Sequence, residues 1–177
     1  MRATLLLAVV VLPFAACSGI KNFELGVHGS TQLNPNDDKQ PTPVRVKVLR
    51  LKGAESADAF RNAAFDDLWG DTITAAGVVV EGQAQYFYVP ARNERVPVQL
   101  QQVPPEVTHI GVLGLFNTPV LGKDRVLLPR DQFGDVEIWL HESMMDTHAP
   151  GTTNPEAPKP EPAKAEPANP GSGKQGS

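Results

Sequence analysis

Short runs of alternating apolar and polar residues dominate the sequence, and proline, glycine or polar stretches separate them. The clearest run is Val44–Leu51, in which three valines alternate with arginine and lysine. Alternation with a period of two is typical of a β-strand that buries one face. Leu49 and Leu51 lie on the face opposite the valines, so we expect that second face to be partly covered. The 17 prolines and 15 glycines argue against long helices.

The same reasoning predicts further strands along the chain, at residues 23–29, 83–89, 96–103, 108–116, 125–128 and 134–142. Residues 72–80 are also strand-like, with a possible helical turn near their start. In the last strand, Ile138 and Leu140 are expected to point inward and Glu137 and His141 outward. Seven or eight short strands with frequent turns predict an all-β fold, an antiparallel β-sandwich.

Residues 56–69 change period and predict one short amphipathic helix, inserted between the second and third strands. Phe60, Ala64 and Leu68 form its apolar stripe. Ser56 is the predicted N-cap, because a serine side chain accepts a hydrogen bond from a free backbone N–H group of the first turn. We expect the stripe to pack on the sheet.

The N-terminus predicts export and lipid attachment. One arginine, an apolar run and small residues make residues 1–16 a signal peptide that is too short to span a membrane. Phe14-Ala15-Ala16-Cys17 resembles the lipobox of bacterial lipoproteins, in which the cysteine is acylated and becomes the first residue. Cys17 is the only cysteine, so no intrachain disulfide forms. The alternative is a buried cysteine beside an ordinary cleaved signal. In such lipoproteins, Ser18 favours the outer membrane.

The C-terminal stretch differs in composition from everything before it. Residues 150–177 contain no aromatic residue and no Val, Ile, Leu, Met or Cys, so they cannot form a core. We therefore expect a tether at 17–22, a β-sandwich domain at 23–145 and a disordered, proline-rich tail at 146–177. The tail is either a solubilising segment or a spacer that reaches peptidoglycan or a partner.

The sequence contains no recognisable catalytic or metal-binding motif, so we expect neither an enzyme nor a cofactor or small-molecule substrate. The net charge of −4, without a Lys/Arg cluster, argues against nucleic acid. Residues 36–38 lack the glycine and final glutamate of a calcium loop. The histidines do not occur at metal-ligand spacing, and an outward-facing strand histidine is expected to be solvated. They are His28, His109, His141 and His148.

The order of several short motifs is more specific than any one of them. After the lipobox come Leu33-Asn34-Pro35, the strand 43–51, the helix with Phe60 and Leu68-Trp69, and the strand Gly111–Phe116. This order resembles the TssJ family, also called SciN or VasD, the outer-membrane lipoproteins of type VI secretion systems. The family pattern has Gly-Arg-Pro where this chain has Lys39-Gln40-Pro41.

The resemblance implies a transthyretin-like sandwich on a lipid anchor, held at the outer membrane and facing the periplasm. It implies a structural role, in which the protein binds the periplasmic C-terminal part of the inner-membrane protein TssM in a complex that also contains TssL. The family contacts TssM through the loop between the first two strands. Here that polar, proline-rich loop comprises Asn34, Pro35, Asn36, Asp37, Asp38, Lys39, Gln40, Pro41, Thr42 and Pro43.

Two alternatives remain at the level of sequence. One is an unrelated envelope lipoprotein whose sandwich binds a small ligand or carbohydrate. The other is a transthyretin-like hydrolase, which is disfavoured because the chain lacks the Tyr-Arg-Gly-Ser motif of that family. Without the resemblance, the loop is better explained as a plain polar connector.

Overall fold

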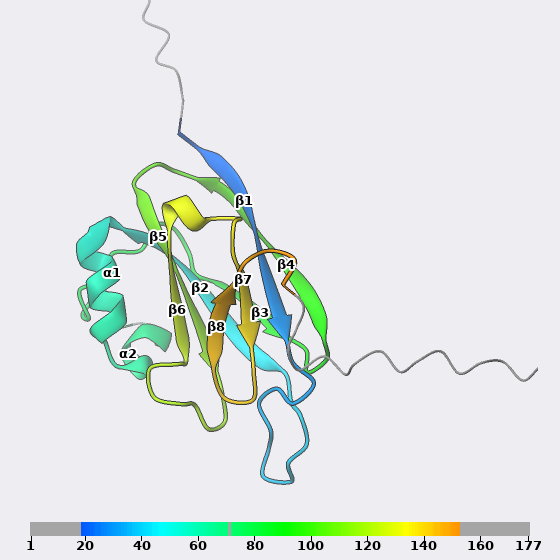
Figure 1. Cartoon of the computed structure of the whole chain (residues 1–177). Coiled ribbons are helices and arrows are strands. Elements are labelled where there is room, and N and C mark those ends of the chain that lie inside the picture. The colour runs from blue at the N-terminus through cyan, green and yellow to red at the C-terminus, as the bar shows by residue number, and fades with distance from the viewer. Residues whose placement is uncertain (1–18, 71, 153–177) are drawn as a thin grey trace, which may run out of the picture.

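Two four-stranded sheets pack face to face in the computed structural model, which describes residues 19–70 and 72–152 (Figure 1). The predicted signal peptide, Cys17 and most of the predicted tail lie outside these residues. None of the helices in the described ranges has the length and apolar character needed to cross a membrane.

The first sheet has the spatial order β4 (Glu94–Val103), β1 (Lys21–Gly29), β7 (Glu137–Leu140) and β8 (Met145–His148). Its pairs β1–β4 and β7–β8 are antiparallel, whereas β1 and β7 run parallel. A parallel neighbour was not part of the predicted antiparallel sandwich. The parallel pair arises because the chain forms β2 to β6 between β1 and β7, so no hairpin joins these two strands.

The second sheet has the order β3 (Gln85–Val89), β2 (Val44–Lys52), β5 (Val107–Leu115) and β6 (Arg125–Pro129), followed by a short 3₁₀ helix, η1 (Arg130–Gln132). All its pairs are antiparallel. The inner faces of the two sheets form the main core, to which β2 contributes Val44, Val46 and Val48 as its period predicted. The all-β sandwich with a helical insertion is therefore confirmed.

Two helices cover the outer face of the second sheet, α1 (Gly53–Asn62) and α2 (Phe65–Trp69) (Figure 1). The prediction of one continuous helix over 56–69 was wrong, because Ala63 and Ala64 both adopt extended backbone angles. The break turns the chain so that Phe60 and Leu68 are both fully buried against the sheet, in a second core with Leu49 and Leu51 and others.

Ser56 is not the N-cap. The helix α1 begins three residues earlier, at Gly53, whose φ of 74° suits glycine. The Ser56 hydroxyl oxygen accepts a hydrogen bond from the backbone N–H of Val79 at 3.0 Å. Residues 72–77 form turns, so the strand expected over 72–80 is reduced to a single bridge between Val80 and Leu51.

Candidate partner-binding site

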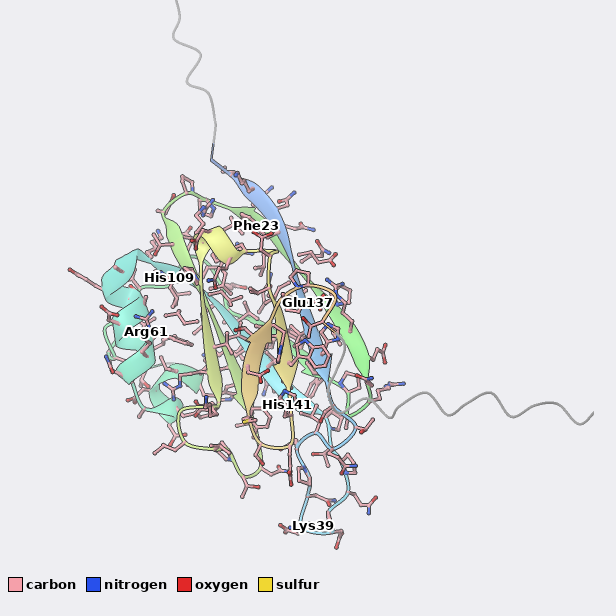
Figure 2. All side chains as sticks on the ribbon, in the orientation of Figure 1. Phe23, Lys39, Arg61, His109, Glu137 and His141 are labelled. Atoms are coloured by element: carbon pink, nitrogen blue, oxygen red, sulfur yellow. The ribbon has the colours of Figure 1, made fainter. Side chains whose placement is uncertain are left out.

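The connection between β1 and β2, residues 30–43, projects from one end of the sandwich, with Lys39 at its far end (Figure 2). Gly19, the first described residue, lies at the opposite end, because β1 runs the length of the sheet between them (Figure 1). At about 3.4 Å per residue, the strand β1 separates the two ends by about 27 Å. The loop is thus remote from the point where the N-terminal segment joins the fold.

Asn34 holds the base of this loop together. It is almost fully buried, and its φ of 48° lies in the left-handed region that asparagine tolerates. Its side-chain amide donates to Thr42 Oγ1 at 2.8 Å, and its Oδ1 accepts the backbone N–H of Asn117 at 2.6 Å. Backbone bonds from Thr42 to Leu33 and from Asn34 to Glu142 complete the clamp. Both ends of the loop are therefore fixed to each other and to two neighbouring turns.

The tip of the loop is a tight turn over residues 36–40. The backbone N–H of Asn36 donates to the carbonyl of Gln40 at 3.0 Å, and the Asn36 side chain accepts the N–H of Gln40 at 2.8 Å. Lys39 has a φ of 60°, a conformation that favours glycine. This chain places a lysine in that conformation, and the Asn36 hydrogen bonds hold the turn. Asp37 and Asp38 are exposed beside it.

The structure thus divides the predicted loop residues by task. Asn34 is buried and Thr42 half-buried, and both hold the loop. The residues from Asp37 to Pro41 are exposed to solvent. Asn117 is a supporting residue that the sequence did not reveal, because it lies 83 positions from Asn34.

An ionic network covers the outer face of the first sheet. Arg95 donates to Glu137 Oε1 at 2.9 Å and to Glu24 Oε1 at 2.7 Å. His28 Nε2 lies 2.9 Å from Glu137 Oε2, and Gln99 donates to Glu24 at 2.6 Å. These groups come from three adjacent strands, β4, β1 and β7, so the network crosses the sheet and leaves this face polar.

The network lowers the pKa of both carboxyl groups. Hydrogen bonds from Arg95 and then from Gln99 hold the pKa of Glu24 below its ordinary value. Burial alone would raise the pKa of Glu137, but hydrogen bonds from Arg95 and His28 and their charges outweigh it and lower the pKa. Both groups are therefore held in the ionised form at neutral pH.

Three potential metal-ligating side chains meet at the other edge of the same face. They are His141, Asp146 and His148, whose ligand atoms all lie within 4.8 Å of one another. The expectation that His141 is solvated was wrong, because it is 6% exposed. The sequence missed this cluster because the hairpin of β7 and β8 brings residues 141 and 148 together, and β8 was not predicted.

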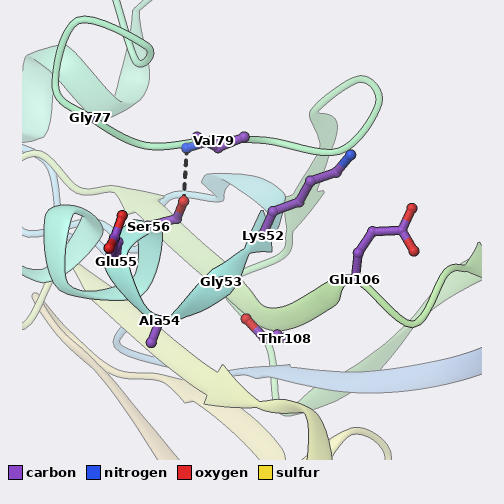
Figure 3. Close-up of a pocket in the computed structure, with 9 residues that line it drawn as sticks. All are labelled: Lys52, Gly53, Ala54, Glu55, Ser56, Gly77, Val79, Glu106 and Thr108. Atoms are coloured by element: carbon purple, nitrogen blue, oxygen red, sulfur yellow. Dashed lines mark hydrogen bonds between the residues drawn. The ribbon is translucent and has the colours of Figure 1, made fainter.

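A depression of about 650 Å³ lies beside the start of α1 (Figure 3). Lys52, Glu106 and Thr108 contribute polar groups to its lining. The Ser56 hydroxyl in the same lining already accepts the Val79 N–H, as the dashed line shows. An ion pair with Glu81 raises the pKa of Lys52, mainly through a hydrogen bond. These two contacts hold the start of α1 and the end of β2 against residues 79–81.

Residues 21–143 match the family model T6SS-SciN, described as type VI secretion lipoprotein, VasD, EvfM, TssJ. The chain belongs to this family. Membership excludes the alternative of an unrelated envelope lipoprotein, and it identifies a structural lipoprotein family that is not an enzyme family. The loop with Asn34 and Lys39 lies inside the matched segment. No curated protein matches the chain.

Solved structures agree on the fold. The T6SS lipoprotein TssJ1 from Pseudomonas aeruginosa is 17% identical with a TM-score of 0.59, over 76% of this chain and 99% of that one. A chain of a structure described as "Type VI membrane complex" is 21% identical with a TM-score of 0.59, over 72% and 97%. A chain of the structure described as "T6SS protein TssM C-terminal domain" from EAEC is 18% identical with a TM-score of 0.58, over 73% and 98%.

Proposed function

We propose that this type VI secretion lipoprotein is a non-catalytic tether. Acylated at Cys17, it is anchored in the outer membrane and faces the periplasm. Through the loop Asn34–Pro43 it binds the periplasmic region of a TssM-like inner-membrane protein, in a complex that also contains TssL. Family membership and the likeness to chains from a type VI membrane complex and a TssM structure support this assignment.

The anchor follows from the sequence at the N-terminus. One acyl chain binds a membrane weakly, and stable attachment takes two or more. The lipobox at residues 14–17 predicts such multiple acylation of Cys17. Only Ser18 separates this cysteine from the first described residue, so the lipid would hold the Gly19 end of the sandwich close to the membrane surface.

The observation that carries the proposal is the clamped loop at the end of the sandwich opposite Gly19 (Figure 1). A domain anchored at one end presents its other end to the periplasm. The Asn34 clamp and the turn at 36–40 fix the loop before a partner arrives, which reduces the entropy lost on binding. The exposed Asp37 and Asp38 offer carboxylates to a partner surface, and charged groups of this kind govern the specificity and rate of association.

The test compares two matched double substitutions in the full-length protein, extracted from membranes with detergent. Asp37→Ala with Asp38→Ala removes two charges from the loop tip and leaves Asn36, whose side chain holds the turn. Asp66→Ala with Asp67→Ala removes two charges that are also exposed, from α2. We expect the loop variant to bind the TssM-like protein at least about tenfold more weakly, or about 1.4 kcal/mol, and the α2 variant to bind normally.

Equal binding by the two variants would show that the partner contact lies outside the loop. Circular dichroism of both variants checks that the fold is unchanged. The anchor is tested separately by Cys17→Ser, which should release the protein from the outer-membrane fraction. Continued sedimentation with that fraction would contradict the lipid anchor.

A further inference from the structure

The hairpin of β7 and β8 places three ligand-type side chains on one face of the first sheet. In its register Leu140 pairs with Met145 and Trp139 with Asp146. His148 lies two residues beyond Asp146 on β8, and His141 lies two residues beyond Trp139, so all three potential ligands share the outer face. The backbone N–H of His141 donates to the carbonyl of Met144 at 2.9 Å, which closes the turn between the strands.

The three side chains already converge on one point. His141 Nε2 lies 3.3 Å from Asp146 Oδ1, and His148 Nε2 lies 2.9 Å from the same oxygen. All three ligand atoms lie within 4.8 Å of one another. Tetrahedral Zn²⁺ with bonds of about 2.0–2.1 Å requires ligand atoms about 3.3 Å apart. Small shifts of the side chains are therefore enough to accommodate a cation.

We propose that His141, Asp146 and His148 bind a divalent transition-metal cation, with Zn²⁺ the best match. Imidazole and carboxylate ligands suit zinc and its neighbours, whereas Mg²⁺ and Ca²⁺ require mainly oxygen ligands. Two histidines and one carboxylate leave the fourth tetrahedral position to water. The site is distinct from the partner-binding loop and uses none of its side chains.

Aromatic packing holds the two imidazoles in place. The Trp139 ring stacks near His141 with centroids 6.5 Å apart and meets His148 edge-on at 5.4 Å. The His141 side chain is 8% exposed, whereas those of His148 and Asp146 are 29% and 40% exposed. The site is thus rigid on one side and open on the other, where a cation and its water ligand can enter.

A bound cation would link β8, which carries Asp146 and His148, to His141 at the end of β7. The strand β8 has four residues and forms the edge of the first sheet, with β7 as its neighbour. The backbone carbonyl of Glu142, the residue after His141, accepts the backbone N–H of Asn34, so the proposed cation site lies next to the base of the loop. A cation that binds the folded chain alone raises its thermal stability by mass action.

The experiment titrates Zn²⁺ into the full-length, tag-free protein in detergent and follows the heat of binding and the melting temperature. We expect one cation per chain and a higher melting temperature with zinc. Co²⁺ in its place should give the visible absorption bands of a tetrahedral site. Asp146→Asn keeps a side-chain oxygen near both histidine rings but removes the anionic ligand, so it tests ligation with a side chain of the same shape.

We expect Asp146→Asn and His148→Ala each to weaken zinc binding by at least about tenfold. The matched control His109→Ala, on β5 of the other sheet, should bind as the wild type does. The same titration in a Cys17→Ser background removes the lone cysteine sulfur, so that zinc binding there cannot depend on it. No saturable binding by the wild type, or equal binding by Asp146→Asn and wild type, would overturn the proposal.

Discussion

The outer faces of the two sheets differ in what lies on them. On the second sheet, the outward residues of β2 include Leu49 and Leu51, and α1 and α2 cover them to form a second apolar core. Phe60 of α1 lies directly over Gly111 of β5, where a Cβ atom would come within 2.6 Å of its ring. On the first sheet, the outward face carries the ionic network around Arg95, and no helix formed by residues 19–70 or 72–152 packs on it.

The covered face nevertheless contains a charge, because Lys47 of β2 is only 3% exposed. Its ammonium group donates to the carbonyl oxygens of Leu68 and Trp69, both at 2.8 Å, at the C-terminal end of α2. A cation at this end of a helix is favourable and satisfies free carbonyl groups. Arg125 of β6 likewise donates to the carbonyl of Ala63, at the end of α1. The sheet therefore fixes its helices by side chains that cap them.

The largest difference between the two faces is expected for removal of an apolar side chain. Phe60→Ala removes a fully buried ring from the covered face and should cost about 3–5 kcal/mol in free energy of unfolding. Gln99→Ala, on the open face, should change it by no more than about 0.5 kcal/mol. Urea denaturation followed by circular dichroism measures both, and similar losses for the two variants would mean that the helices do not form a second core.

A smaller effect is expected for the buried charge. Lys47→Met keeps an apolar stem but leaves the carbonyl oxygens at the end of α2 without their donor, at a cost of about 1–3 kcal/mol. Lys52→Met, the same substitution at the end of the same strand, loses only a partly exposed ion pair and should cost much less than Lys47→Met. A stabilised Lys47→Met protein would show that the cap is dispensable.

On the open face, the expected effect is smaller still and depends on pH. Glu137→Gln should cost about 1 kcal/mol at pH 7, where the carboxylate accepts hydrogen bonds from Arg95 and His28. Folding lowers the pKa of Glu137 below its ordinary value of 4.5, so this stability is present above that value and is lost as the pH falls through the folded pKa.

Thermal melts of wild type and variant at pH 7 and at acidic pH measure this difference. The two proteins should approach equal stability in acid. The exposed Glu106→Gln serves as control and should show little effect at either pH. A constant difference between Glu137→Gln and wild type at all pH values would assign the loss to packing, and not to charge.

Local patterns predicted those features that depend on neighbours in sequence. The alternating valines predicted the strand β2, and Leu49 and Leu51 on its other face predicted that this face is covered. The prolines and polar residues of 34–43 predicted the loop. The helical period did not predict the break at Ala63-Ala64, since Phe60 and Leu68 fit one continuous stripe as well as they fit the two helices that pack on the sheet. The short strand β8 has only Met145 buried, so it lacks an alternating pattern.

The supporting contacts of the site depend on residues that are distant in sequence. Asn34 meets Asn117 because the loop folds back on the turn after β5, and no motif encodes that meeting. His141 and His148 meet only because β7 and β8 form a hairpin. The tip residues Asp37 and Asp38 were named from the resemblance and from local polarity, and the structure adds that they stand on a fixed turn.

Contact between the loop and its partner is measured most directly by photo-crosslinking. A photoreactive amino acid placed at Asp38 in the full-length protein, in cells with an intact secretion complex, should crosslink to the periplasmic region of the TssM-like protein on irradiation. The same amino acid at Asp67, also exposed, on α2, should not. Crosslinks to that region from position 67, with none from position 38, would contradict the loop as the partner-binding site.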